Sequence, residues 1–240
     1  MLGKYPLIVT ILVMLAAIPS LSRGQDATAA LAGVSEAMGR PPGTLRVTAA
    51  GSEYGVGEDV GTLGRSRIES YTLELDLGKP AAYTRLVLVD QTASDIEGPE
   101  KTETALTESS SPWSQRYRLW TTPYGFLAGA LGAAAVAAES EKIAGVPYRV
   151  VSFTPAGGNE IRGYINDENL VEKTRTEFTD PVLGDVKFEA SYLDWTEFDG
   201  LKYPTIIIEK ENGTLHRVLV VQKVERDVTL DAAASGAAGA

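Results

Sequence analysis

The chain has 240 residues, of which 44% are hydrophobic and 22% are charged, a balance that suits one or two folded domains. Its net charge is −10 and no basic run is longer than a pair, so nucleic acid is excluded as a partner because phosphate binding needs clustered Lys and Arg. With one histidine and no cysteine, the chain almost lacks the nitrogen and sulfur ligands of zinc, and we expect no metal and no cofactor.

Residues 1–24 have the pattern of an export signal. Lys4 supplies a positive charge, Leu7–Ile18 is an apolar run, and Ser22-Arg23-Gly24 places small residues at the two cleavage positions. The alternative is an uncleaved membrane anchor, but the run is shorter than the roughly 20 apolar residues that a spanning helix needs. We therefore expect cleavage after Gly24, a periplasmic or secreted protein, and no stable membrane insertion of the mature chain.

The first part of the mature chain predicts a helix and then strands. The helix is expected over Asp26–Met38, because Asp26 is a plausible N-cap and apolar residues recur at helical spacing. Strands are expected over Leu45–Ala50, Ile68–Leu77 and Tyr83–Asp90. The glycine-rich segment Gly51–Gly64 is predicted to be irregular. Thr92–Pro112 is polar, acidic and rich in serine, which predicts a disordered segment or a mobile flap.

A second helix is predicted in the middle of the chain, after the aromatic and basic stretch Trp113–Trp120. Pro123 opens this helix, which is expected to run to about Glu141. Its body, Phe126–Ala138, carries no charge and consists almost entirely of Ala, Gly, Leu and Val. A helix that is apolar all round is buried or spans a membrane, and this one is too short to span. We therefore expect a buried helix whose small side chains allow close approach to a sheet.

The last third of the chain is nearly continuous strand. Six runs are separated by short turns, which force antiparallel neighbours. These runs are Tyr148–Thr154, Glu160–Ile165, Leu170–Phe178, Val186–Trp195, Tyr203–Glu211 and Leu215–Val224. The predicted fold class is α+β: a large curved antiparallel β-sheet, or half-open barrel, with one or two helices on its concave face. Residues 26–228 form a single domain in this prediction, and 229–240 form a disordered Ala/Gly tail or linker.

One histidine and one group of acidic residues are candidates for catalysis or metal binding. His216 is a candidate ligand or general base, but a lone histidine needs partners, so we expect a solvated or satisfied strand histidine. Asp194, Glu197 and Asp199 cluster between two strands. Their spacing does not match a calcium loop, so a solvated acidic turn is expected.

An aromatic and aliphatic group is the candidate ligand site. Its members could rim an apolar pocket that takes an acyl chain, or they could simply fill the concave face as ordinary core, since aromatic residues dominate cores. A cavity of ~300 Å³ or more would favour the pocket. The group consists of Trp113, Tyr117, Trp120, Tyr124, Phe126, Leu127 and Leu131.

Several stretches resemble a known family. Trp120-Thr-Thr-Pro-Tyr-Gly-Phe126 resembles the LW-x-T-P-x-G-F stretch in the N-terminal domain of secreted metallo-β-lactamase-fold hydrolases. The stretches Gly163–Glu172, Asp180–Asp185 and Tyr203-Pro204 resemble the same domain, so the resemblance covers roughly Ala29–Val224. The half-barrel pattern is also similar to the LolA/LolB-like periplasmic lipoprotein carriers and receptors, whose sheet wraps a hydrophobic cavity.

The resemblance does not extend to catalysis. In the hydrolase family a following domain carries a His-x-His-x-Asp-His motif, which this chain lacks, so no catalytic residue carries over and we expect no enzyme. The first hypothesis is an exported non-catalytic domain that binds an apolar (acyl or lipid-like) ligand or a partner domain. The alternative is the N-terminal accessory domain of a zinc hydrolase whose catalytic domain is absent from this chain. An open reading frame with clustered histidines beyond residue 240 would favour the alternative.

Overall fold

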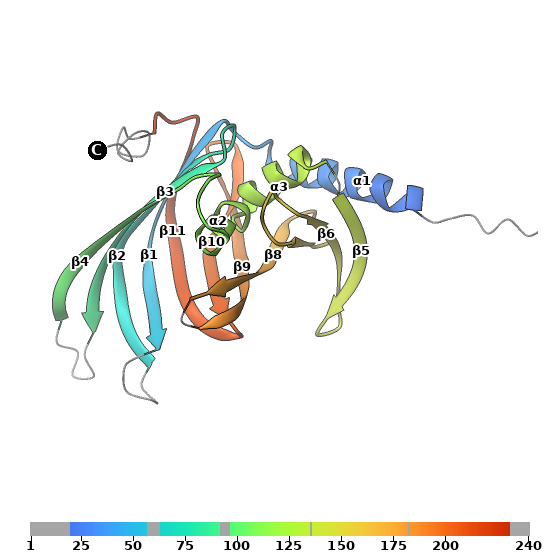
Figure 1. Cartoon of the computed structure of the whole chain (residues 1–240). Coiled ribbons are helices and arrows are strands. Elements are labelled where there is room, and N and C mark those ends of the chain that lie inside the picture. Colours follow the sequence, from blue (N-terminus) through green and yellow to red (C-terminus); the bar gives the residue numbers. More distant parts are fainter. Residues whose placement is uncertain (1–19, 57–62, 92–96, 135, 182, 231–240) are drawn as a thin grey trace, which may run out of the picture.

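The part of the chain that the structure describes forms one large antiparallel sheet and three helices (Figure 1). The computed structural model describes residues 20–56, 63–91, 97–134, 136–181 and 183–230. The helices are α1 (Ser20–Met38), α2 (Trp113–Trp120) and α3 (Pro123–Gly132). The strands are β1 (Thr44–Val56), β2 (Leu63–Asp76), β3 (Ala81–Gln91), β4 (Glu97–Thr107), β5 (Val136–Ile143), β6 (Val146–Phe153), β7 (Ile161–Ile165), β8 (Val171–Asp180), β9 (Gly184–Phe198), β10 (Leu201–Glu211) and β11 (Thr214–Arg226).

The strand order explains why the helices lie where they do. The order is β4-β3-β2-β1-β11-β10-β9-β8-β7-β6-β5, so the first and last strands pair at the middle of the sheet. The two edge strands, β4 and β5, are therefore consecutive along the chain, and the segment that joins them contains α2 and α3. This segment crosses the hollow of the curved sheet, as Figure 1 shows. The predicted α+β fold, with helices on the concave face, is confirmed.

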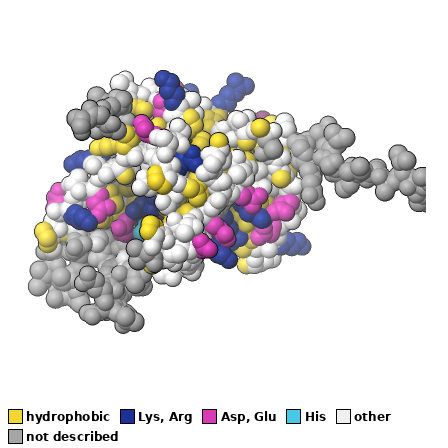
Figure 2. Space-filling model, viewed as in Figure 1, with side chains coloured by type: hydrophobic (Ala, Val, Ile, Leu, Met, Phe, Trp, Pro, Cys, Tyr) yellow, Lys and Arg dark blue, Asp and Glu magenta, His cyan; other side chains and the backbone are white. Residues whose placement is uncertain are grey.

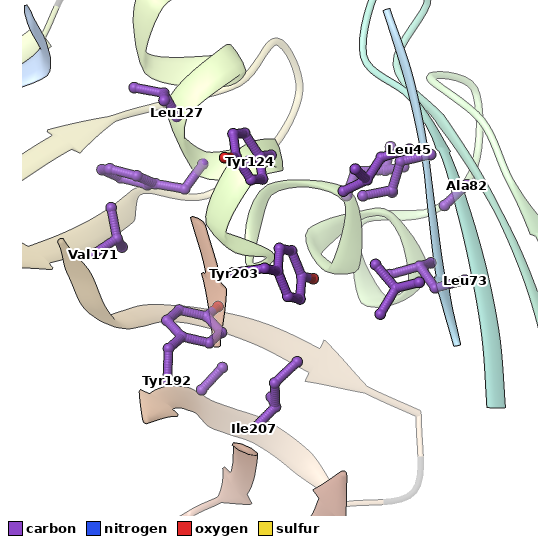
Figure 3. Close-up of a cluster of buried hydrophobic side chains, with 14 of the residues drawn as sticks. Leu45, Leu73, Ala82, Tyr124, Leu127, Val171, Tyr192, Tyr203 and Ile207 are labelled. Carbon is purple, nitrogen blue, oxygen red and sulfur yellow. The ribbon is translucent and has the colours of Figure 1, made fainter. Parts of the chain in front are cut away.

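The core lies between the helices and the concave face of the sheet. On β9, Val186, Phe188, Ala190 and Tyr192 are each at most 2% exposed, which is the inward side that alternation predicts. Figure 3 shows side chains from α3 and from strands on both halves of the sheet that turn toward this interior. One hydrophobic cluster thus spans both halves of the sheet.

The long apolar helix predicted to end near Glu141 is wrong in its second half. Helix α3 ends at Gly132, and Ala133 already has an extended backbone with φ −74° and ψ 140°. From Val136 the chain is strand β5, paired in register with β6 from Val136↔Phe153 to Ile143↔Val146. Alanine has the highest intrinsic helix propensity, but propensities differ by less than about 1 kcal/mol per residue for most residues, so pairing with a neighbouring strand outweighs this preference.

The disordered segment or flap predicted over Thr92–Pro112 is wrong for residues 97–107, whereas 108–112 form a turn before α2. Residues 97–107 form β4, which pairs with β3 from Ala82↔Thr107 onward, whereas 92–96 lie outside the described residues. An edge strand tolerates a polar, charged sequence because one side faces solvent, and charges there discourage further pairing. The glycine-rich region is likewise strand up to Val56 and again from Leu63, and 57–62 lie outside the description.

Helix α1 begins at Ser20, so Asp26 lies inside the helix and is not its N-cap. Residues 1–19, which hold most of the predicted export signal, lie outside the described residues, as do 231–240 of the predicted tail. Within the described part of the chain, no helix is long and apolar enough to cross a membrane. The single domain over 26–228 stays a prediction.

Candidate functional site

Helix α2 buries one member of the predicted aromatic group deep in the core. Tyr117 is 1% exposed and stacks on Phe178 at 4.5 Å between ring centroids, with Phe188 at 4.8 Å on another side. Burial raises the pKa of Tyr117 to about 12, so the phenol stays neutral at physiological pH. This contact fixes the helix against strands β8 and β9.

Helix α3 buries three more members of the group. Thr122 caps the helix by accepting a hydrogen bond from the backbone N–H of Gly125 at 3.1 Å. Tyr124 is fully buried, stacks on Tyr203 at 6.1 Å, and donates its hydroxyl hydrogen bond to the carbonyl oxygen of Met38 at the end of α1. Phe126 and Leu127 are also fully buried.

Phe126 lies against a glycine of the sheet. A Cβ atom built on Gly163 of β7 would be only 2.1 Å from the Cζ atom of Phe126, so only glycine leaves room for the ring. This close approach positions α3, and hence the connection from α2, against the sheet.

The other three members differ in their exposure. The Trp113 indole N–H donates to the carbonyl oxygen of Glu177 at 2.8 Å, and Trp120 packs against the core at its edge. Leu131 is 51% exposed, so the expectation that it is buried is wrong. None of the seven residues lines either of the two cavities described below. Ligand binding by this group stays a prediction.

A cavity of about 230 Å³ lies on the concave side, between α2 and strands β2, β3 and β4. Its wall is apolar at Leu73, Ala82 and Leu86, and it is charged at Arg118, Glu209 and Arg217. The full lining is Tyr71, Leu73, Ala82, Thr84, Leu86, Glu103, Thr104, Ala105, Thr107, Arg118, Thr121, Thr122, Glu209 and Arg217.

The charged end of the cavity is a small ion-pair network. The Arg217 side chain is 9% exposed; its Nε donates to Glu53 at 2.9 Å, and its Nη1 lies 3.4 Å from a Glu209 oxygen. Arg118 of α2 approaches the same Glu209 oxygen at 3.5 Å. Burial opposes ionisation of Glu209, yet Arg217 and Arg118 hold its pKa below the ordinary value, so this carboxylate is charged at neutral pH.

A further polar group near this network has no hydrogen-bond partner among the described residues. Tyr203 is fully buried, and its hydroxyl makes no hydrogen bond within the described part of the chain. In Figure 3 this hydroxyl points toward Leu73, a residue of the cavity wall. Burial raises the pKa of Tyr203 well above its ordinary value, with Tyr71 and Glu209 among its electrostatic neighbours, so the group is a neutral donor.

The residues that the sequence offered for acid–base or metal chemistry, His216 and the acidic group around Asp194, do not line the concave cavity. His216 Nε2 is 3.9 Å from a Glu211 oxygen, and burial together with Arg217 lowers the pKa of His216. Asp194 and Asp199 have positive φ values of 52° and 47°, as turn and bulge positions do. Among the described residues, no three His, Cys, Asp or Glu side chains meet in a way that could hold a metal ion.

A larger groove, of about 790 Å³, lies over strands β5 and β7 to β9 and the end of β10. Both of its arginines are paired: Arg162 with Glu141 at 2.7 Å, and Arg175 with Glu189 at 2.7 Å. Figure 2 shows acidic and basic side chains interleaved over strands β5 to β9. Because these arginines already pair with carboxylates, whereas the smaller cavity lies inside the hollow of the sheet beside α2, we place the candidate site in the smaller cavity.

No family model matches the chain, and no curated protein matches it in sequence. In structure it is similar to a DUF1329 family protein from Desulfovibrio piger, with a TM-score of 0.48, 11% identity, and coverage of 90% of this chain and 98% of that one. It is similar to a LolA superfamily protein from Nitrosomonas europaea, with a TM-score of 0.45, 17% identity, and coverage of 86% and 96%.

A third similar structure is an outer membrane lipoprotein-sorting protein domain from Vibrio parahaemolyticus, with a TM-score of 0.40, 10% identity, and coverage of 85% and 95%. Two of the three names agree with the LolA-like part of the expected resemblance. None of the three is a metallo-β-lactamase-fold hydrolase.

Proposed function

We propose that this protein is an exported, non-catalytic binding protein that holds an acyl or lipid-like ligand in the concave cavity between α2 and strands β2, β3 and β4. The observation that carries the proposal is the apolar wall formed by Leu73, Ala82 and Leu86, which lies inside the hollow of the sheet and beside α2. Export rests on the pattern of residues 1–24.

The size of the cavity suits one acyl chain. At 230 Å³ the cavity is smaller than the ~300 Å³ that favours a pocket for a whole ligand, so it has room for a single short chain or for one end of a longer one. Each methylene group that leaves water contributes about 0.8 kcal/mol, which makes chain length the main determinant of affinity. Edge strand β4 and helix α2 form the sides of the cavity, and a longer chain would extend between them.

The proposal is tested by filling the cavity without disturbing the core. Ala105 of β4 lines the cavity yet is exposed, so Ala105→Phe should occupy the space at little cost in stability. Ala137 is an exposed alanine on the other edge strand, β5, and Ala137→Phe is the matched control. Binding of a dansylated undecanoic acid is followed by its fluorescence.

We expect saturable binding to the wild-type protein, an affinity about tenfold weaker in Ala105→Phe, and no change in Ala137→Phe. Loss of one or two buried methylene groups corresponds to a change of this order. Binding that is absent in the wild type, or is weakened equally by both substitutions, would count against the concave cavity as the site.

A further inference from the structure

The two arginines that line the concave cavity, Arg118 and Arg217, differ in how many hydrogen-bond and ion-pair partners they have. Arg217 is nearly buried, binds Glu53 with both Nε and Nη2, contacts Glu209 at 3.4 Å and lies over the ring of Tyr71. Its donors therefore have partners within the fold. Arg118 has one carboxylate neighbour in the described part of the chain, Glu209 at 3.5 Å, and that oxygen is shared with Arg217.

Arg118 lies where a molecule bound in the cavity can reach its donors. Its side chain is 37% exposed, its guanidinium lies 5.2 Å from the ring centroid of Tyr117, and it forms part of the cavity wall. A guanidinium carries five N–H donors in a planar fork, which matches the oxygens of a carboxylate or phosphate. The single contact with Glu209, at 3.5 Å, leaves most of these N–H donors without a protein acceptor in the described part of the chain.

Two other acidic residues near the cavity pair with other cations and not with Arg118. Glu53 is taken by Arg217, and Glu103 at the cavity wall is paired with Lys101 at 2.6 Å. The cavity therefore joins an apolar wall to a partly covered cation that has only a share of one carboxylate. An amphipathic molecule with a negative head has the complementary arrangement.

We propose that Arg118 anchors the anionic headgroup of an acyl ligand, a carboxylate or phosphate, while the acyl chain lies along Leu73, Ala82 and Leu86. This inference rests on the proposed function, because it assigns the polar half of the same cavity. Glu209 holds the guanidinium in place from the side of the sheet, and the free edge of the fork faces the ligand. The site therefore selects ligands by headgroup charge as well as by chain length.

The experiment compares ligands that share one ten-carbon chain and differ in the headgroup. Decanoate, decyl phosphate, 1-decanol and decyltrimethylammonium are titrated by calorimetry, below their micelle concentrations, into the full mature chain. The variants are Arg118→Met, which removes the charge, and Arg118→Lys, which keeps the charge but removes the fork. Arg85→Met is the control, because Arg85 is an exposed arginine on the face of β3 opposite the cavity residue Thr84.

For the wild type we expect at least one anionic ligand to bind about tenfold more tightly than decanol, since charge-assisted hydrogen bonds are stronger than neutral ones. Arg118→Met should abolish this preference, so that the anions bind no more tightly than decanol does; Arg118→Lys should retain part of the preference, and Arg85→Met should retain all of it. The tighter of the two anions identifies the headgroup as a carboxylate or a phosphate.

Two failures are distinguishable. Equal affinity for all four ligands, or an anion preference that survives in Arg118→Met, overturns the assignment of Arg118 but leaves an apolar binding site in place. Absence of binding for every ligand, decanol included, overturns the proposed function itself. If Arg118→Met does not fold, as judged by circular dichroism, the comparison of Arg118→Lys with Arg85→Met decides the question.

Discussion

The contact between Phe126 and Gly163 offers a quantitative test of how the helices are fixed to the sheet. A Cβ atom on Gly163 would lie 2.1 Å from Cζ of Phe126 and 2.4 and 2.5 Å from two other ring atoms. The ring is fully buried and cannot move aside freely. Overpacking of this kind costs about 1–3 kcal/mol, and we expect Gly163→Ala to lie at the upper end of that range. Phe126→Ala alone should cost about 3–5 kcal/mol, through lost burial and the cavity left behind.

The double variant separates steric conflict from general damage to the core. Once Phe126 is alanine, a methyl group on Gly163 has space, and it partly fills the cavity. Gly163 does not have a positive φ, so alanine adds no backbone strain there. We therefore expect the double variant to cost no more than Phe126→Ala alone, an interaction energy of about 1–3 kcal/mol.

The assay is urea unfolding followed by tryptophan fluorescence, with stabilities taken from the midpoint and slope. Gly132→Ala is the matched control, because a Cβ atom at Gly132 meets no other atom within 4 Å. This variant should change stability by less than about 0.5 kcal/mol. If the costs of Gly163→Ala and Phe126→Ala simply add in the double variant, the two residues are not in steric contact and the placement of α3 is refuted.

Two further predictions follow from burial. Leu127→Asp should unfold the protein or lower its stability by several kcal/mol, because it leaves an unpaired charge in a fully buried site. Leu131→Asp, on the exposed side of the same helix, should change the urea midpoint little. Similar effects of the two substitutions would mean that α3 is rotated. Burial raises the pKa of Tyr71 and of Tyr117 to about 12 from 10, so the folded state keeps protons that the unfolded state loses. Stability should be full below pH 10 and fall as the pH rises toward 12, together with the phenolate absorbance at 295 nm; a flat urea midpoint between pH 9 and 11.5 would contradict this.

Strands whose pairing is local were predictable from the sequence. β9, β10 and β11 follow one another through short turns at residues 199–200 and 212–213, and β9 alternates apolar inward residues with polar outward ones. Because hairpin neighbours are set by turn length and alternation, both order and facing follow from residues within about 15 positions.

Elements that depend on distant partners were not predictable in the same way. β4 is polar along its length, and its strand state comes from pairing with β3 at the edge of the sheet. β5 begins within an alanine-rich stretch that reads as helix, and pairing with β6 overrides that local preference. Secondary structure that is decided by tertiary contacts leaves little trace in local composition.

Part of the candidate site could have been found from the alternation of the strands. Glu209 follows the inward residue Ile207 by two positions, and Arg217 precedes the inward residue Leu219 by two, so both charges occupy positions that alternation directs into the concave face. Arg118 lies in the aromatic and basic stretch Trp113–Trp120, whose helical state depends on packing against Phe178 and Phe188. The sequence thus contained the inward charges, but it did not show that a helix brings a third charge to meet them.

These inward charges are costly, and this cost bears on function. Removing two arginines and two glutamates from water carries a desolvation penalty that an apolar replacement would avoid, so stability alone does not account for the network. The buried hydroxyl of Tyr203 has no hydrogen-bond partner in the described residues, and Arg118, whose side chain is 37% exposed, has only a shared carboxylate at 3.5 Å. Arg118 forms part of the cavity wall, and the hydroxyl of Tyr203 points toward Leu73 of that wall. An acceptor group bound in the cavity would pair with the guanidinium of Arg118, which is the reason to expect selectivity for a headgroup rather than for an acyl chain alone.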